Sequence, residues 1–161
     1  FLFTLRNGLL SDLQRGGGMC YAEKLLISRQ DQLSPMHTHA IKAEDIINRG
    51  GATLVVELFG SDDIGHCAPD RGGVVLCDGI ARPYAAGDKL KLAPGESVTL
   101  MPGDWHAFWG EGGDVLIGEV STVNDDEVDY IFREAIGRFA EIEEDVAPTH
   151  LLVSDYAAWL G

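Results

Sequence analysis

The sequence is poor in cysteine and has no long apolar run. Its three cysteines, Cys20, Cys67 and Cys77, include no Cys-x-x-Cys pair, which argues against a disulfide framework and against a thiolate zinc site. A reducing cytoplasm is therefore the expected location. The apolar opening FLFTLRNGLL is too short to cross a bilayer, so we expect a strand there.

Basic residues are also scarce. Lys and Arg total 12 against 26 Asp and Glu, which gives a formal net charge of −14. A field of that sign repels nucleic acid and anionic membranes. The composition therefore favours a small neutral or cationic ligand and makes a phosphorylated substrate less favourable, although a metal with local lysines could offset the field.

The remaining composition predicts one globular all-β domain. A chain of 161 residues with 45% hydrophobic content is long enough to bury a sizeable core. Its 20 glycines and six prolines are scattered, which is typical of many tight turns and not of a helical bundle. Regularly spaced turns between short strands indicate a sandwich or barrel.

The expected strands follow from β-forming runs separated by glycine-rich turns. We expect residues 43–49 to form a helical turn, and the acidic stretch 124–139 to hold a short helix or an extended arm. The predicted strands cover residues 1–6, 21–29, 52–60, 73–77, 80–84, 89–92, 97–101, 106–109 and 114–120.

Three histidines and one glutamate form a candidate metal site. His37 and His39 are two residues apart, so in a strand both side chains point to the same face. Glu44 follows five positions after His39, and His106 closes a Pro-Gly-Asp-Trp-His turn elsewhere in the chain. Imidazole and carboxylate ligands suit manganese, zinc, cobalt, nickel or iron. Four protein ligands leave positions open for a substrate on a six-coordinate ion.

The other histidines, Cys67 and the aromatic residues near His106 have simpler explanations than a role in catalysis or metal binding. A single histidine is more often structural than a ligand, so we expect His150 to be structural. His66 and Cys67 could suggest a second metal site or a nucleophilic pair, but a surface loop explains them better. The aromatic residues beside His106 are Trp105, Phe108 and Trp109. At least two of them should pack in the core, and one could form an apolar wall for a sugar.

Two motifs carry a resemblance to the cupin superfamily. PMHTHAIKAEDIINRGG resembles the first cupin motif, and GESVTLMPGDWH, with its glycines at 95 and 103, resembles the second. Proline directly before Gly103, and Gly110 in place of the usual asparagine, depart from the pattern without removing a ligand. The resemblance implies a cupin double-stranded β-helix, a jelly-roll barrel with a few short helical segments.

Within that superfamily the chain resembles the D-lyxose isomerases. The similarity runs through FTLRNG, YAEKLLISR, both motifs, GEVSTVNDD and GRFAEIEED. It implies a divalent metal, usually Mn²⁺, and interconversion of D-lyxose with D-xylulose, with D-mannose and D-fructose as slower substrates. It also implies a homodimer. We expect residues 1–161 to be a single cupin domain that lacks an N-terminal part of the full-length gene product.

Aldose–ketose exchange through a cis-enediol requires a base besides the metal ligands. Acid runs are usually solvated, but the resemblance favours one glutamate of GRFAEIEED. We assign Glu144 as the base among Glu141, Glu143 and Glu144, with Asp155 as a supporting acid. Lys24, on the strand face opposite Glu23, is the expected partner of a sugar hydroxyl.

Two other functions are compatible with these residues. The same four ligands could hold Fe(II) in an oxygen-activating cupin dioxygenase. The pocket could also belong to a non-catalytic sugar-binding accessory protein. Loss of turnover in a Glu144→Gln variant that still binds metal and sugar separates an isomerase from a binder.

Overall fold

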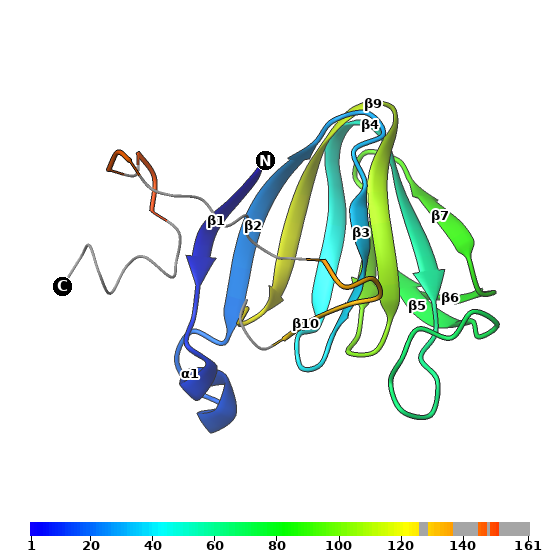
Figure 1. Ribbon diagram of the computed structural model, residues 1–161, viewed down its shortest axis with the longest axis horizontal. Coiled ribbons are helices and arrows are strands. Elements are labelled where there is room, and N and C mark those ends of the chain that lie inside the picture. Colours follow the sequence, from blue (N-terminus) through cyan, green and yellow to red (C-terminus); the bar gives the residue numbers. More distant parts are fainter. Residues whose placement is uncertain (126–128, 137–144, 148, 152–161) are drawn as a thin grey trace.

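The computed structural model describes residues 1–125, 129–136, 145–147 and 149–151. In this part of the chain, strands dominate and the helix is short, which confirms the all-β prediction (Figure 1). The elements are β1 (Leu2–Asn7), α1 (Leu10–Arg15), β2 (Tyr21–Ser28), β3 (Ser34–His39), β4 (Glu44–Phe59), β5 (Gly73–Cys77), β6 (Ile80–Tyr84), β7 (Asp88–Leu92), β8 (Ser97–Leu100), β9 (Trp105–Thr122) and β10 (Tyr130–Phe132).

Two long antiparallel strands, β4 and β9, organise the sheet. The main strand order is β1-β2-β9-β4-β8-β5-β6, while β3 pairs with β9, β10 with β3, and β7 with β4. Figure 1 shows β2, β9 and β4 side by side, with β1 next to β2 at the edge. All strand pairs are antiparallel.

Each long strand contributes to two layers. The first part of β4 pairs with β8 and its last part with β7. The first part of β9 pairs with β3 and its last part with β2. Apolar side chains from both parts form one core, among them Leu26, Ile46, Val56 and Phe108. The jelly-roll-like arrangement therefore comes from two bent strands and their partners.

Glycines allow the bends in β4 and β9. The β4–β9 register shifts between Asn48 and Gly50 and again between Gly51 and Thr53. Gly51 has a φ of 97°, and a Cβ there would lie 2.3 Å from the carbonyl oxygen of Asp114. A side chain therefore cannot be placed at this bulge without moving the backbone.

These bulges explain two errors in the predicted strands. The helical turn over 43–49 is wrong, because those residues lie mostly in β4, which starts at Glu44. The predicted strands 106–109 and 114–120 form one strand, β9. In both places a glycine pair in the sequence suggested that the strand ends there. In the structure β4 and β9 bulge opposite each other, and they stay paired beyond the bulge.

Two smaller elements also differ from the expectation. Residues 10–15 form α1, which was not predicted, and it ends at Gly16 in the left-handed conformation, at a φ of 67°. The stretch expected to hold a helix or an extended arm contains the short strand β10, paired with β3. No helix among the described residues is long and apolar enough to cross a membrane.

The interior has an apolar part and a charged part. Along β9, Val115, Ile117, Glu119 and Ser121 alternate with outward residues and are all buried. The first two belong to the core cluster, whereas Glu119 lies opposite Lys24 of β2. One end of the barrel interior is therefore lined by ionisable side chains.

Candidate metal centre

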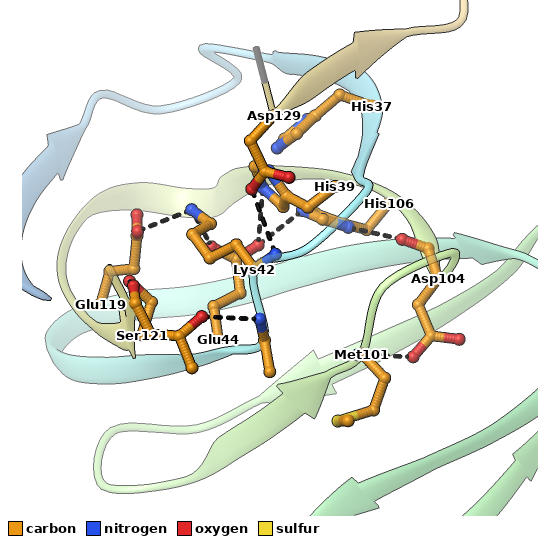
Figure 2. A network of polar contacts seen from close by, with 12 residues as sticks. His37, His39, Lys42, Glu44, Met101, Asp104, His106, Glu119, Ser121 and Asp129 are labelled. Carbon is orange, nitrogen blue, oxygen red and sulfur yellow. Dashed lines mark hydrogen bonds and ion pairs between the residues drawn. The ribbon is translucent and has the colours of Figure 1, made fainter. Parts of the chain in front are cut away.

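The structure brings the four predicted ligands together. His37 and His39 lie on β3, His106 pairs directly with His37 across β3 and β9, and Glu44 begins β4. One ligand atom from each of the four lies within 4.8 Å of the others, and all four residues are buried (Figure 2). Ligands about 2.0–2.2 Å from one ion are at most about 4.4 Å apart, so the group is close to the size that an ion requires.

Backbone carbonyls orient two of the histidines. His37 Nδ1 is 2.7 Å from the Pro35 carbonyl oxygen, and His106 Nδ1 is 3.0 Å from that of Asp104. A carbonyl only accepts, so each Nδ1 carries a proton, and Nε2 is the atom that each ring offers to a metal when the ring is neutral. Burial, followed by repulsion from His106, lowers the pKa of His37 well below its ordinary value. That ring is therefore neutral, as a metal ligand must be.

Glu44 Oε1 faces the Nε2 atoms of His106 and His39. It lies 3.0 Å from His106 Nε2 and 3.3 Å from His39 Nε2, yet none of these atoms has a hydrogen-bond partner among the described residues. Burial acts to raise the pKa of Glu44, but the facing rings of His106 and His39 and the Lys42 ammonium hold it well below its ordinary value. These rings lower the pKa of Glu44 only when each Nε2 carries a proton. With neutral rings protonated on Nδ1, the carboxylate oxygen would face two lone pairs, which is unfavourable unless a cation lies between them.

The donor set therefore fits a divalent ion. Three imidazoles and one carboxylate match manganese, iron, cobalt, nickel or zinc, and they do not distinguish these metals. Among the described residues, the buried charges also favour a cation, because the carboxylates of Glu44, Glu119 and Asp129 outnumber the ammoniums of Lys24 and Lys42. Buried charge without a partner is costly, and a bound cation would compensate it.

A chain of ion pairs extends from Glu44 into the barrel. Lys42 Nζ lies 2.6 Å from Glu44 Oε2 and 2.9 Å from Glu119 Oε1. Figure 2 shows the Lys42 side chain between these two glutamates. Lys24 Nζ lies 2.9 Å from the same Glu119 oxygen. Burial acts to lower the pKa of Lys42, but the charges of Glu44 and Glu119 outweigh it and raise that pKa above its ordinary value. Lys42 therefore stays protonated in the buried site.

Asp129 fixes the bend that joins β3 to β4. Its carboxylate accepts the backbone N–H groups of Ile41 at 2.7 Å and Lys42 at 3.1 Å. Asp129 Oδ2 also lies 3.5 Å from His39 Nδ1. The adjacent Tyr130 ring contacts His39 edge-on, with the centroids 4.4 Å apart. Asp129 is thus the carboxylate that can orient His39, as carboxylates commonly orient metal-bound histidines.

We predict that Asp129→Asn weakens manganese binding about 10- to 100-fold, the usual effect of removing a group that orients a ligand. The amide can still accept one backbone N–H group, but it no longer offers a charged acceptor to His39. Titration of the metal-free protein with Mn²⁺ measures the change. Asp63→Asn is the matched control, because the Asp63 side chain is 88% exposed. Equal affinities for the two variants would contradict this role.

The other predicted site residues have different outcomes. Lys24 faces the interior as expected and is buried, but its ammonium contacts Glu119. Glu144 and Asp155 lie outside the described residues. Trp105 and Phe108 are buried, as expected for at least two of the three aromatic residues.

Sequence reasoning missed Lys42, Glu119 and Asp129. Glu119 had a signal, because it interrupts an apolar strand at a position that shares its face with Val115 and Ile117. Lys42 lies inside the first motif, between His39 and Glu44, where only the ligands drew attention. Asp129 belongs to an acidic run, and no local pattern distinguishes it from its neighbours.

Solved structures with a similar fold include sugar isomerases. The L-ribose isomerase of Acinetobacter sp. DL28, in complex with L-ribose, aligns with a TM-score of 0.58 and 18% identity over 84% of this chain and 70% of that chain. The L-ribose isomerase of Cellulomonas parahominis, with L-psicose, gives 0.57 and 18% over 83% and 69%. At this identity the likeness concerns the fold alone, and it agrees with the predicted cupin β-barrel.

Sequence comparisons are more specific. The chain is 49% identical to the D-lyxose/D-mannose isomerase of Serratia proteamaculans, over 99% of this chain and 70% of that protein. It is 46% identical to the D-lyxose/D-mannose isomerase of Escherichia coli O157:H7, over 96% of this chain and 68% of that protein. The family model for D-lyxose isomerase matches residues 1–156. This chain therefore belongs to the D-lyxose isomerase family.

Proposed function

We propose that the protein interconverts D-lyxose and D-xylulose, with D-mannose and D-fructose as slower substrates. The proposed metal ligands are His37, His39, Glu44 and His106. The observation that carries the proposal is the convergence of buried ligand atoms from these four residues. Among them, Glu44 Oε1, His106 Nε2 and the ring nitrogens of His39 lack hydrogen-bond partners among the described residues. The relatives named for D-lyxose and D-mannose support the choice of sugars.

The reaction moves two protons. The proton on C2 of the aldose is removed and delivered to C1, while the hydroxyl proton on O2 is lost and O1 gains one. A bound divalent ion would polarise the sugar oxygens on C1 and C2 and stabilise the negative charge of the enediolate. The protein must then supply a base for the carbon-bound proton and donors for the two oxygens.

Lys42 is the best-placed donor in the described part of the chain. An ammonium has three N–H groups, and the carboxylates of Glu44 and Glu119 accept two of them. The third N–H is proposed to be donated to a sugar oxygen beside the ligand group, in place of the Tyr130 ring, whose centroid lies 5.2 Å from Nζ. Because the Lys42 side chain is fully buried, its charge acts with little screening on a developing oxyanion.

Glu144 is the proposed base, and Asp155 is proposed to position a sugar hydroxyl. Glu44 is a poor alternative, because its pKa is held well below the ordinary value. A carboxylate with so low a proton affinity, shared with a metal, removes a carbon-bound proton inefficiently. The base must therefore come from another carboxylate.

Incubation of the protein with Mn²⁺ and D-lyxose tests the activity. We expect D-xylulose to accumulate to an equilibrium mixture, and chelation of the metal to stop the reaction. Absence of turnover on every pentose and hexose, with metal bound, would refute the proposal. Activity that needs Fe(II) and consumes oxygen would instead indicate an oxygen-activating cupin.

The base can be tested separately. Glu144→Gln should lose turnover while retaining both manganese and the sugar, whereas a sugar-binding accessory protein has no turnover to lose. Glu141→Gln and Glu143→Gln are the matched controls from the same acidic run. Loss of turnover in one of these controls, with an active Glu144→Gln protein, would move the base to that position.

The proposal includes further features of the working protein. We propose Mn²⁺ as the metal, a homodimer as the assembly, a cytoplasmic location, and a single cupin domain over residues 1–161. Elemental analysis of the purified protein and its mass in solution test the first two. A bound metal other than manganese, or a monomeric mass, would overturn the respective part.

A further inference from the structure

We infer that Ser61, in the loop of residues 60–72 between β4 and β5, is a positioning residue for the candidate ligand His106. Its hydroxyl holds the turn that leads into β9, and that turn sets where His106 lies relative to His39. The inference deepens the proposed function and rests on it, because it takes His39 and His106 as ligands of one divalent ion.

The turn between β8 and β9 determines the orientation of His106. It consists of residues 101–104, between the end of β8 and the start of β9. Within it, Asp104 Oδ2 accepts the Met101 N–H group at 2.8 Å, and the Asp104 N–H group is donated to the Met101 carbonyl at 2.9 Å. The Asp104 carbonyl also binds the His106 ring, as Figure 2 shows. A displacement of this turn would therefore displace the ring.

Gly103 connects the turn to two other segments of the chain. Its N–H group is donated to the carbonyl oxygen of His39 at 3.1 Å, and its own carbonyl accepts the Ser61 hydroxyl at 2.6 Å. Gly103 has a φ of 89°, and a Cβ there would lie 3.3 Å from Ser61 Oγ. The Gly103 backbone is thus held by two partners, a candidate ligand on β3 and the β4–β5 loop.

The β4–β5 loop is itself held in place beside the turn. The Arg71 guanidinium donates to the Ser61 carbonyl at 3.2 Å. A second contact between loop and strand comes from Trp105, whose Nε1 donates to the Gly65 carbonyl at 3.3 Å. Trp105 is buried and directly precedes His106. The loop therefore contacts the chain at two positions just before the candidate ligand.

Stability alone does not account for the Ser61 contact. Water can replace the hydroxyl as a donor to a part-buried turn carbonyl, so such a bond contributes little to the net free energy of folding. Water would not fix the carbonyl in space, whereas a hydroxyl on a hydrogen-bonded loop does. Metal–ligand distances must hold to about 0.2 Å, so a site that includes His106 depends on the position of this turn.

Ser61→Ala tests the inference through metal binding. We expect manganese affinity to fall about 10-fold, as when a group that orients a ligand is removed. Ser61→Thr keeps the hydroxyl and should keep the affinity. The visible absorption of bound Co²⁺, which depends on ligand geometry, should change in Ser61→Ala and not in Ser61→Thr. An unchanged manganese affinity, or an unchanged Co²⁺ spectrum, in Ser61→Ala would overturn the positioning role.

Ser97→Ala is the matched control. The Ser97 hydroxyl donates to Asp78 Oδ1 at 2.9 Å, and Ser97 begins β8, at the opposite end of that strand from the turn. The substitution also removes one serine hydrogen bond, but it should leave manganese affinity and the Co²⁺ spectrum unchanged. An equal loss of affinity in Ser97→Ala and Ser61→Ala would show general destabilisation and overturn the inference.

The test of Ser61 does not depend on turnover. Manganese affinity is measured without sugar, so a wild-type protein that converts no sugar refutes the proposed function and leaves the role of Ser61 to the titration. If the wild-type protein binds no divalent ion, crystals of the metal-free proteins decide. We expect the Gly103 carbonyl and the His106 ring to shift in Ser61→Ala, and their superposition on the wild type would overturn the inference.

Discussion

His106→Gln is expected to lose manganese binding and to lower isomerase activity about 1000-fold or more. Gln occupies a similar volume but has no imidazole nitrogen to face Glu44 Oε1, which lies 3.0 Å from His106 Nε2. It also lacks the Nδ1–H group that binds the Asp104 carbonyl. Metal polarisation contributes several kcal/mol to such a transition state, and about 1.4 kcal/mol corresponds to a tenfold change in rate.

Calorimetric titration with Mn²⁺ and a ketose assay measure the two effects. His66→Gln is the matched control, because the His66 side chain is 73% exposed in the loop before β5. It should bind manganese and turn over sugar as the wild-type protein does. Wild-type manganese affinity in His106→Gln would show that His106 is not a ligand.

Lys42→Met is expected to lower kcat about 100- to 1000-fold, the usual cost of removing one preorganised donor from a developing oxyanion. Met keeps most of the aliphatic stem but removes the ammonium between Glu44 and Glu119. Manganese affinity should not fall, because the substitution removes a positive charge from beside the metal ligands. Loss of turnover with retained metal is thus the signature expected of Lys42.

Separate assays of metal affinity and steady-state kinetics check this expectation. Lys89→Met offers a control lysine outside the site, where the ammonium lies over the Trp109 ring. A Lys42→Met protein that turns over sugar at the wild-type rate would rule out a donor role. Loss of manganese binding in Lys42→Met would instead indicate that Lys42 holds the Glu44 carboxylate in position as a metal ligand.

The four candidate ligands were predictable because the signal was local. Alternation along a strand places His37 and His39 on one face, and the glycines of the second motif frame His106. The family resemblance carried by the same strings is confirmed by the comparisons, and with it the enzyme class, a sugar ketol-isomerase. None of this required knowledge of strand pairing.

The buried charged side chains next to the candidate ligands could not be predicted in the same way. Lys24, Lys42 and Glu119 are far apart in the sequence, and only the register of β2, β9 and β4 brings the charges together. A shift of one residue would turn each inward side chain outward. The register itself depends on bulges at Gly50–Gly51 that resemble chain breaks in the sequence. Polar residues at inward positions of apolar strands were the available clue.

The long pairing of β4 with β9 also bears on how the chain folds. Glu44 pairs with Ser121, whereas His106 pairs with Leu58 near the other end of the same two strands. Such contacts join residues that are distant in sequence, and proteins dominated by them fold slowly. The four candidate ligands come together only when β4 and β9 are paired at both ends. Metal uptake during refolding would therefore report a late, nearly native state and not an early nucleus.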